Sequence, residues 1–200
     1  MKKIVVIPGV GLFNDDRPDH YLFKALEKQL PEFEVEWVNW QHTFKLPDTG
    51  LPYSTFRKWV SEVLLDYQMV IKNGLDVDIP EGDYYIGHSA GSILALLQRS
   101  PSIICGSPAA LVEDLQGMHP IDCMLNSQPV FNLIHKHDLL AYPFPFCHVE
   151  NKLVNTKWWK FNNWEPISSH TSYFNDKKIC NMIVDKIKEW EGDYTARNII

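Results

Sequence analysis

One pentapeptide in this sequence has the residue types and the spacing of a reactive serine: Gly87-His88-Ser89-Ala90-Gly91. It follows an apolar run and precedes an apolar helical segment, which is the setting of a nucleophile elbow. A serine on so tight a strand-to-helix turn has strained backbone angles, and the flanking positions must be small because neighbouring segments pass close by. Gly87 and Gly91 meet that demand. Backbone N–H groups at the start of the helix would then face a negatively charged oxygen formed during acyl transfer.

A serine hydroxyl becomes a strong nucleophile only when an imidazole takes its proton, and that imidazole needs a carboxylate to orient it and stabilise its charge. After a nucleophile elbow these groups are expected in the order Asp, then His. Asp138 follows an apolar run at 128–134, at the strand edge where open parallel sheets build their active sites. His170 lies between the last expected strand and the last expected helix. These positions predict a Ser89–His170–Asp138 triad.

Two other arrangements of histidines compete with this triad. His135, His137 and Asp138 are three possible metal ligands within four residues, but residues 135 and 137 share a face only on a strand, and no fourth ligand is evident. We therefore predict no metal ion. His148 also follows Asp138 and is an alternative base, but it precedes the last expected strand, so His170 is the preferred base.

The glycines after the first apolar run give only a weak sign of a dinucleotide site. Gly9-Val10-Gly11 begins a Gly-x-Gly pattern, but the full fingerprint needs a glycine or alanine where Asn14 stands. The sequence therefore predicts no cofactor. His88, at the variable position of the elbow, is interpreted as structural.

The strands and helices that would position these residues are predicted from short apolar runs that alternate with segments of helical period. This alternation is typical of an α/β domain, with a mostly parallel central sheet and helices on both faces. We expect one domain over 1–200. Glutamates alternate with apolar residues over 33–38, which places that strand near a sheet edge. Strands are expected at 3–8, 33–38, 83–86, 102–105, 128–134 and 157–161, and helices at 19–30, 54–72, 89–99 and 176–190.

Composition excludes several classes of protein. The chain has 200 residues, of which 45% are hydrophobic, enough for one large core. Its net charge of -6 argues against a sequence-independent grip on nucleic acid or on an anionic membrane surface. No apolar run approaches the roughly 20 residues that span a bilayer. Scattered cysteines predict reduced thiols and a cytoplasmic location; they are Cys105, Cys123, Cys147 and Cys180.

Taken together, these motifs resemble those of small serine hydrolases of the α/β-hydrolase superfamily. The chain is similar in outline, from Ile4 to Trp190, to the compact family that includes retinoblastoma-binding protein nine. The resemblance rests on residues 7–11 after the first strand, 86–91 at the elbow, 137–138 after a late strand and His170 before the final helix. The chain departs from the usual fold between 141 and 161, where prolines and a β-rich run replace the expected helix.

The resemblance implies a role for each matching residue. Ser89 would be the nucleophile, Asp138 the acid and His170 the base. The oxyanion hole would use the N–H of Ala90 and one N–H from Val10 or Gly11.

The expected activity is hydrolysis of a carboxylic ester or related acyl bond in a small-molecule substrate, through an acyl-serine intermediate. Thioesterases and acyltransferases use the same triad, and a non-catalytic interaction module that keeps the fold is a further alternative. Binding alone would not require the complete Ser-Asp-His order, so the enzyme is preferred. Only segments 40–52 and 108–127 are long enough to overhang Ser89, so we expect little or no cap and a preference for short acyl chains. The sequence carries no sign of an oligomeric state.

Overall fold

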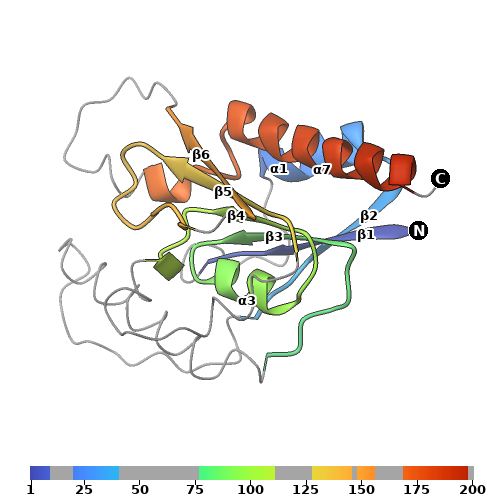
Figure 1. The fold of residues 1–200 in the computed structure, drawn as a ribbon, viewed down its shortest axis with the longest axis horizontal. Coiled ribbons are helices and arrows are strands. Elements are labelled where there is room, and N and C mark those ends of the chain that lie inside the picture. The colour runs from blue at the N-terminus through green and yellow to red at the C-terminus, as the bar shows by residue number, and fades with distance from the viewer. Residues whose placement is uncertain (10–19, 41–76, 111–127, 146–147, 156–168, 198–200) are drawn as a thin grey trace.

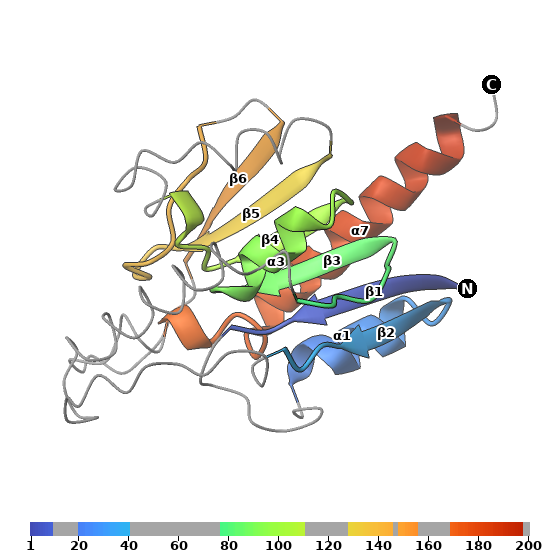
Figure 2. The same ribbon diagram turned by 90° about the horizontal axis from the view of Figure 1, so that it is seen from below.

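The computed structural model describes residues 1–9, 20–40, 77–110, 128–145, 148–155 and 169–197. Within these ranges six strands form one sheet, and every neighbouring pair of strands is parallel. The order across the sheet is β2-β1-β3-β4-β5-β6 (Figures 1 and 2). The strands are β1 (Lys2–Ile7), β2 (Phe33–Trp37), β3 (Tyr84–His88), β4 (Ser102–Cys105), β5 (Val130–His135) and β6 (Val149–Val154). The helices are α1 (Tyr21–Gln29), α3 (Gly91–Leu97) and α7 (Lys177–Arg197).

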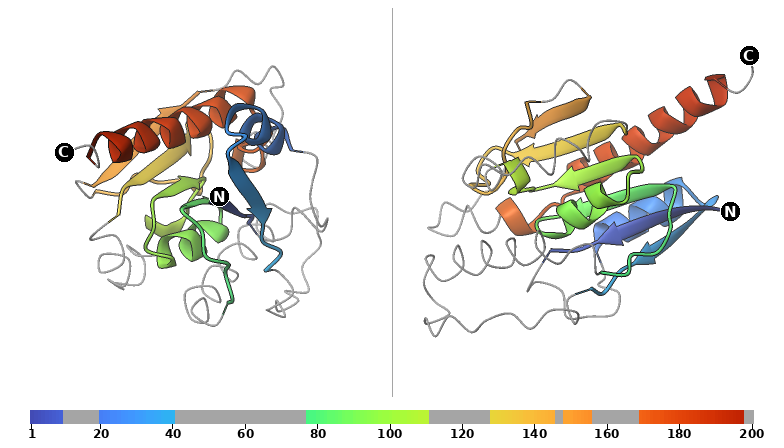
Figure 3. Two further views of the ribbon diagram at one scale, coloured as in Figure 1. Left: turned by 90° about the vertical axis from the view of Figure 1, so that its right-hand side faces the viewer. Right: turned by 60° about the horizontal axis from the view of Figure 1, so that its bottom comes forward.

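Helices cover both faces of the sheet. α1 and α7 lie side by side on one face, and α3 lies on the other (Figures 1 and 3). Side chains of β1 alternate between the two layers, since Ile4 and Val6 belong to the core under α1 and α7, whereas Val5 and Ile7 belong to the core under α3. Strands covered on both faces must be apolar throughout, and β3, β4 and β5 are accordingly buried at every residue.

The sequence predicted these central elements correctly, with shifts at their ends. The strand expected at 83–86 continues to His88, and the helix expected from residue 89 begins at Gly91. The last helix starts as expected, because Asp176 Oδ1 accepts the N–H groups of residues 178 and 179 as an N-cap, and it continues to Arg197. The predicted helix 54–72 and strand 157–161 lie outside the described residues, as do most of segments 40–52 and 108–127.

Among the described strands, β2 and β6 lie at the two edges of the sheet (Figure 2). The edge position of β2 confirms the prediction made from its alternating glutamates. Strand β6 was not predicted, because its only buried residues are those at its two ends, Val149 and Val154. A buried lysine joins this edge to α7, since Lys186 Nζ lies 2.7 Å from Glu150 Oε2 in β6.

Two further observations bear on expectations from composition. Among the described residues, no helix is both long enough and apolar enough to cross a membrane. Cys105 and Cys180 are buried and form no disulfide, whereas Cys123 and Cys147 lie outside the described residues.

A pair of asparagines ties the loop after β5 to the sheet. Asn132 Nδ2, in β5, donates to the Tyr142 carbonyl oxygen at 3.0 Å and to Asn151 Oδ1 at 2.9 Å. The Asn151 side chain, in β6, accepts the Phe144 N–H at 3.0 Å and donates to the Phe144 carbonyl oxygen at 2.7 Å. Residues 136–145 of this connection form no helix. The hydrogen bonds of the two amides attach this segment to the sheet instead. They hold the segment that directly follows Asp138.

We expect Asn132→Ala to lower the free energy of unfolding by about 1–3 kcal/mol, because the Tyr142 carbonyl oxygen and Asn151 Oδ1 would both lose the donor that the buried Asn132 side chain supplies. Urea unfolding followed by tryptophan fluorescence measures the change. Lys152→Ala is the control, since Lys152 is exposed on the neighbouring strand and its truncation should cost no more than about 0.5 kcal/mol. Equal stability of the Asn132→Ala and wild-type proteins would contradict the support we assign to the amide pair.

Candidate active site

Ser89 occupies the turn between β3 and α3, in a backbone conformation that serine rarely adopts. Its φ is 52°, in the left-handed region, which costs a non-glycine residue roughly 1–2 kcal/mol. Hydrogen bonds hold it there: the Ser89 N–H donates to the Cys105 carbonyl oxygen at 3.0 Å. The Ser89 carbonyl oxygen accepts both the N–H and the hydroxyl of Ser92, at 3.1 and 2.5 Å. The strained elbow expected from the sequence is therefore present.

Close backbone contact explains why the position two residues after Ser89 must be glycine. A Cβ on Gly91 would lie 2.4 Å from the carbonyl oxygens of Ile7 and Pro8. Backbone atoms cannot yield as a flexible side chain can, so the end of β1 packs on α3 only because this side chain is missing.

His170 links Ser89 to Asp138 by two hydrogen bonds. Its Nε2 lies 2.9 Å from Ser89 Oγ, and its Nδ1 lies 2.9 Å from Asp138 Oδ2. Three separate segments meet here: the β3–α3 turn, the loop after β5 and a short helical turn at 169–171. The His170 and Asp138 side chains are 2% and 0% exposed. The structure thus brings together all three residues of the predicted triad, in the connectivity that transfers a proton from the hydroxyl to the imidazole.

Asp138 stays ionised although it is buried. Burial alone would raise the pKa of this carboxyl group, but the nearby His170, together with hydrogen bonds from His170, the Leu140 N–H and the Tyr173 hydroxyl, lowers the pKa below its ordinary value. The Leu140 N–H donates to Oδ1 at 2.9 Å, and the Tyr173 hydroxyl donates to Oδ2 at 3.0 Å. A carboxylate at neutral pH can accept the Nδ1–H of His170 and stabilise a positive charge on its ring.

His88, interpreted from the sequence as structural, contacts His170 directly. Its Nε2 lies 2.6 Å from the backbone carbonyl oxygen of His170, and the two rings are 5.0 Å apart. Burial, followed by the proximity of His170, lowers the pKa of His88 to about 3. The ring is therefore neutral, and its Nε2–H donates to the His170 carbonyl oxygen. His88 therefore holds the backbone of His170 in place.

Gly106 and Tyr173 were not singled out from the sequence, yet both lie against the triad. Gly106 follows β4 with a φ of 60°, and a Cβ there would lie 2.8 Å from Tyr173 Cε2 and 2.9 Å from Asp138 Oδ2. Only glycine fits such a position without strain. No sequence pattern marks either residue, because Gly106 lies far along the chain from Asp138 and a single tyrosine after His170 has no diagnostic spacing.

The predicted oxyanion hole is described in part. Ala90 follows Ser89 as the N-terminal cap of α3 and is buried. Val10 and Gly11 lie outside the described residues. The segment that leads to them does reach Ser89, since a Cβ on Gly9 would lie 2.6 Å from Ser89 Cβ. The role of the N–H groups of Ala90 and of Val10 or Gly11 stays a prediction.

The alternative histidine arrangements have little geometric support. The rings of His135 and His137 are 5.9 Å apart, but the carboxylate of Asp138 is directed to His170 and Tyr173. Within the ranges that the structure describes, no three His, Cys, Asp or Glu side chains converge as ligands of one metal would. His148 directly precedes β6, and it is His170 that contacts Ser89.

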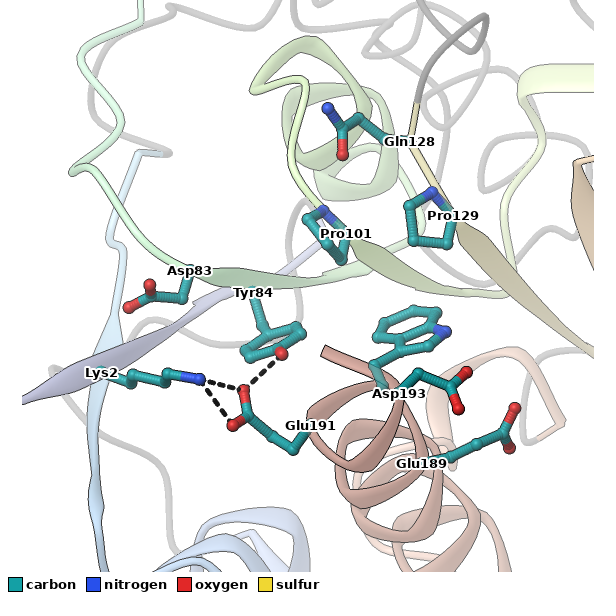
Figure 4. A pocket seen from close by; sticks show the side chains of 10 residues that line it. Lys2, Asp83, Tyr84, Pro101, Gln128, Pro129, Glu189, Glu191 and Asp193 are labelled. Atoms are coloured by element: carbon teal, nitrogen blue, oxygen red, sulfur yellow. Dashed lines mark hydrogen bonds and ion pairs between the residues drawn. The ribbon is translucent and has the colours of Figure 1, made fainter. Parts of the chain in front are cut away.

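A cavity of about 550 Å³ lies at the amino-terminal ends of the strands, opposite to the ends where Ser89 and Asp138 lie (Figure 4). Glu191 stands in its lining, accepting from the Tyr84 hydroxyl at 2.5 Å and pairing with Lys2 at 2.6 Å. Ser89 follows the carboxyl end of β3, whereas Tyr84 is the first residue of that strand. The cavity is therefore separate from the candidate active site at Ser89.

No protein-family model matches the sequence, and no curated protein matches it either. We therefore infer the function from the geometry and the chemistry of the described residues.

We expect Gly106→Ala to lower the free energy of unfolding by about 2–4 kcal/mol, because the new methyl group combines backbone strain with overlap against Tyr173 and Asp138. Urea unfolding measures the loss. Gly192→Ala is the matched control, because nothing lies within 4 Å of a Cβ at that position in α7. Alanine there should stabilise the helix by up to about 1 kcal/mol. An equal change in the free energy of unfolding for both variants would contradict the close packing that we describe around Gly106.

We expect His88 to make the fold sensitive to acid. Its pKa is about 3 in the folded protein but about 6.5 in an unfolded chain, so the unfolded chain binds the proton first. The stability that depends on neutral His88 is present above pH 6.5 and is lost as the pH falls toward 3, which amounts to about 2 kcal/mol at pH 5.

His88→Gln tests this, because glutamine retains an N–H donor for the His170 carbonyl oxygen but does not titrate. Between pH 8 and pH 5 the variant should lose about 2 kcal/mol less stability than the wild-type protein. Urea unfolding at the two pH values measures both losses. An identical pH dependence in the two proteins would show that His88 is not the group responsible.

Proposed function

We propose that this protein is a serine hydrolase with an α/β-hydrolase fold, cleaving a carboxylic ester or a related acyl bond of a small-molecule substrate. The observation that carries the proposal is the buried relay in which His170 lies 2.9 Å from Ser89 Oγ and 2.9 Å from Asp138 Oδ2. The strained elbow of Ser89 supports the same function, because it presents the hydroxyl at the carboxyl ends of parallel strands.

In the proposed reaction, Ser89 Oγ attacks the acyl carbon while His170 Nε2 takes the hydroxyl proton. The ionised Asp138 stabilises the resulting imidazolium and keeps Nδ1 protonated. When the tetrahedral intermediate collapses, the bond to the leaving group breaks and His170 returns the proton to that group. A water molecule then attacks the acyl carbon of the acyl-serine while His170 takes its proton. The bond to Ser89 Oγ breaks, His170 returns the proton to that oxygen, and the carboxylic acid is released.

A negative charge develops on the substrate oxygen in both halves of this reaction. We assign its stabilisation to the N–H of Ala90 and to one N–H from Val10 or Gly11. Loss of one such donor typically costs about a hundred- to a thousandfold in kcat. No cofactor is needed for these steps.

The cost of building the site argues for catalysis over a purely structural or binding role. Ser89 is held in a left-handed conformation, and Asp138 is an ionised carboxylate buried in the protein. Each feature reduces stability unless it is compensated, and such features concentrate at functional sites. A module that only bound another protein would gain nothing from them. Thioester hydrolysis and acyl transfer use the same groups, and the acceptor that reaches the acyl-serine would distinguish them.

The buried free thiols of Cys105 and Cys180 fit a reducing compartment. We therefore propose a cytoplasmic location for the enzyme.

We expect Ser89→Ala to abolish both labelling by a fluorescent fluorophosphonate and hydrolysis of p-nitrophenyl acetate, while the circular dichroism spectrum stays that of the wild-type protein. The removed oxygen lies at a turn, so little core volume is lost. Ser102→Ala is the matched control, because Ser102 is an equally buried serine at the start of β4. It should label like the wild-type protein.

Two outcomes would count against the proposal. One is a wild-type protein that does not react with the fluorophosphonate, or that reacts at a residue other than Ser89. The other is esterase activity that disappears in a strong chelator and returns with zinc, since that result would favour the His135, His137 and Asp138 alternative.

A further inference from the structure

We propose that Tyr173 is a positioning residue for the triad: its hydroxyl group holds the Asp138 carboxylate in the orientation that receives His170. This inference rests on the proposed serine hydrolase function, and it adds a fourth side chain to the apparatus.

The direction of each hydrogen bond at the Tyr173 hydroxyl follows from its partners. The backbone N–H of His135 lies 2.7 Å from the hydroxyl oxygen and can only donate to it. Asp138 Oδ2 lies 3.0 Å away and, as a carboxylate oxygen, can only accept. The single phenolic proton must therefore point at Asp138. Burial, and then the charge of Asp138, raises the pKa of Tyr173 well above its ordinary value, so the proton is retained.

Tyr173 and His170 approach the same carboxylate from one short segment of chain. His170 Nδ1 lies 2.9 Å from Oδ2, and the Tyr173 hydroxyl lies 3.0 Å from the same atom. Two donors fixed on one segment define the orientation of the Asp138 carboxylate more tightly than His170 alone, because rotation of the carboxylate would break the bond to Tyr173. The Leu140 N–H on Oδ1 completes the restraint at 2.9 Å.

The tyrosine ring is itself held in place. It is fully buried, and it lies 5.7 Å from the ring of His88. Gly106 brings the backbone after β4 against the edge of the ring, where a Cβ would lie 2.8 Å from Cε2. The bond from the His135 N–H joins the hydroxyl to the end of β5, and the Asp138 N–H donates to the His135 carbonyl oxygen at 2.9 Å. Tyr173 therefore orients Asp138 from a rigid support.

The hydroxyl also sets how strongly Asp138 acts on His170. A donor to a carboxylate stabilises its charge and leaves less of that charge to stabilise an imidazolium. Removing the donor should therefore raise the pH at which the triad becomes active, and a stronger donor should lower that pH. Two other titratable groups packed here, His88 and Cys105, stay neutral near pH 7, since burial lowers the pKa of His88 to about 3 and raises the pKa of Cys105.

The first test is Tyr173→Phe, which keeps the ring and removes only the hydroxyl. We expect kcat for p-nitrophenyl acetate, and the rate constant for fluorophosphonate labelling of Ser89, to fall by at least about tenfold, with KM unchanged within about twofold. Tyr84→Phe is the matched control. It also removes a tyrosine hydroxyl that donates to a carboxylate, that of Glu191, but this pair lies at the amino-terminal end of β3 (Figure 4). It should leave both rates unchanged. A smaller fall in Tyr173→Phe, or an equal fall in Tyr84→Phe, would overturn the proposal.

A second test does not depend on whether Tyr173→Phe folds. Site-specific replacement of Tyr173 by 3-fluorotyrosine preserves the hydroxyl and makes it a stronger donor. The pH at which Ser89 labelling reaches half of its plateau rate should then move to a lower value, whereas the same replacement at Tyr84 should not move it. An unchanged pH profile would overturn the proposal.

The two proposals fail in different ways. If wild-type Ser89 does not react with the fluorophosphonate, the serine hydrolase function and the role of Tyr173 fall together. If wild-type Ser89 reacts and the Tyr173 variants keep its rate and pH profile, the role of Tyr173 alone is wrong.

Discussion

Burial of the Asp138 carboxylate imposes the strongest constraint on this structure. An ionised carboxylate removed from water is tolerated only where donors surround it, and here three groups supply them: His170, the Leu140 N–H and Tyr173. These donors come from the loop after β5 and from the segment before α7, so neither segment can shift alone. The glycine at position 106 follows from the same constraint, because the space beside Oδ2 is already filled. The contacts of the candidate site and the packing of the carboxyl edge are thus one set of interactions.

The sheet provides the rigidity that this arrangement needs. β3 and β4 are central, fully buried strands, and the Ser89 N–H is bonded to the last residue of β4. The unfavourable backbone angle of Ser89 is therefore compensated by contacts on both sides of the turn. The outer connection from β5 to β6 lacks a helix over its described part, and there the side chains of Asn132 and Asn151 support the loop.

How much was predictable from the sequence depends on the range of the interactions concerned. The central strands and the elbow are encoded locally, by apolar runs and by small residues at fixed spacing, and they were predicted within a few residues. β6 was missed because an edge strand exposed over its middle residues has no apolar run. The roles of Tyr173, Gly106 and His88 arise from contacts between segments distant in the chain, for which one sequence carries no signal. The order Ser, Asp, His predicted which residues the structure brings together, although it could not predict the hydrogen bonds that orient them.

The order of these groups along the chain also has a consequence for biosynthesis. Ser89, the proposed nucleophile, precedes His170, the proposed base, by 81 residues, and His170 lies in the same segment as Tyr173 and α7. A ribosome that adds about 5–20 residues per second needs several seconds to cover that interval. During this time the emerging polypeptide contains Ser89 without the His170 imidazole that we propose as its base. The proposed esterase chemistry therefore requires that the segment carrying His170 has left the ribosome and packed onto the sheet.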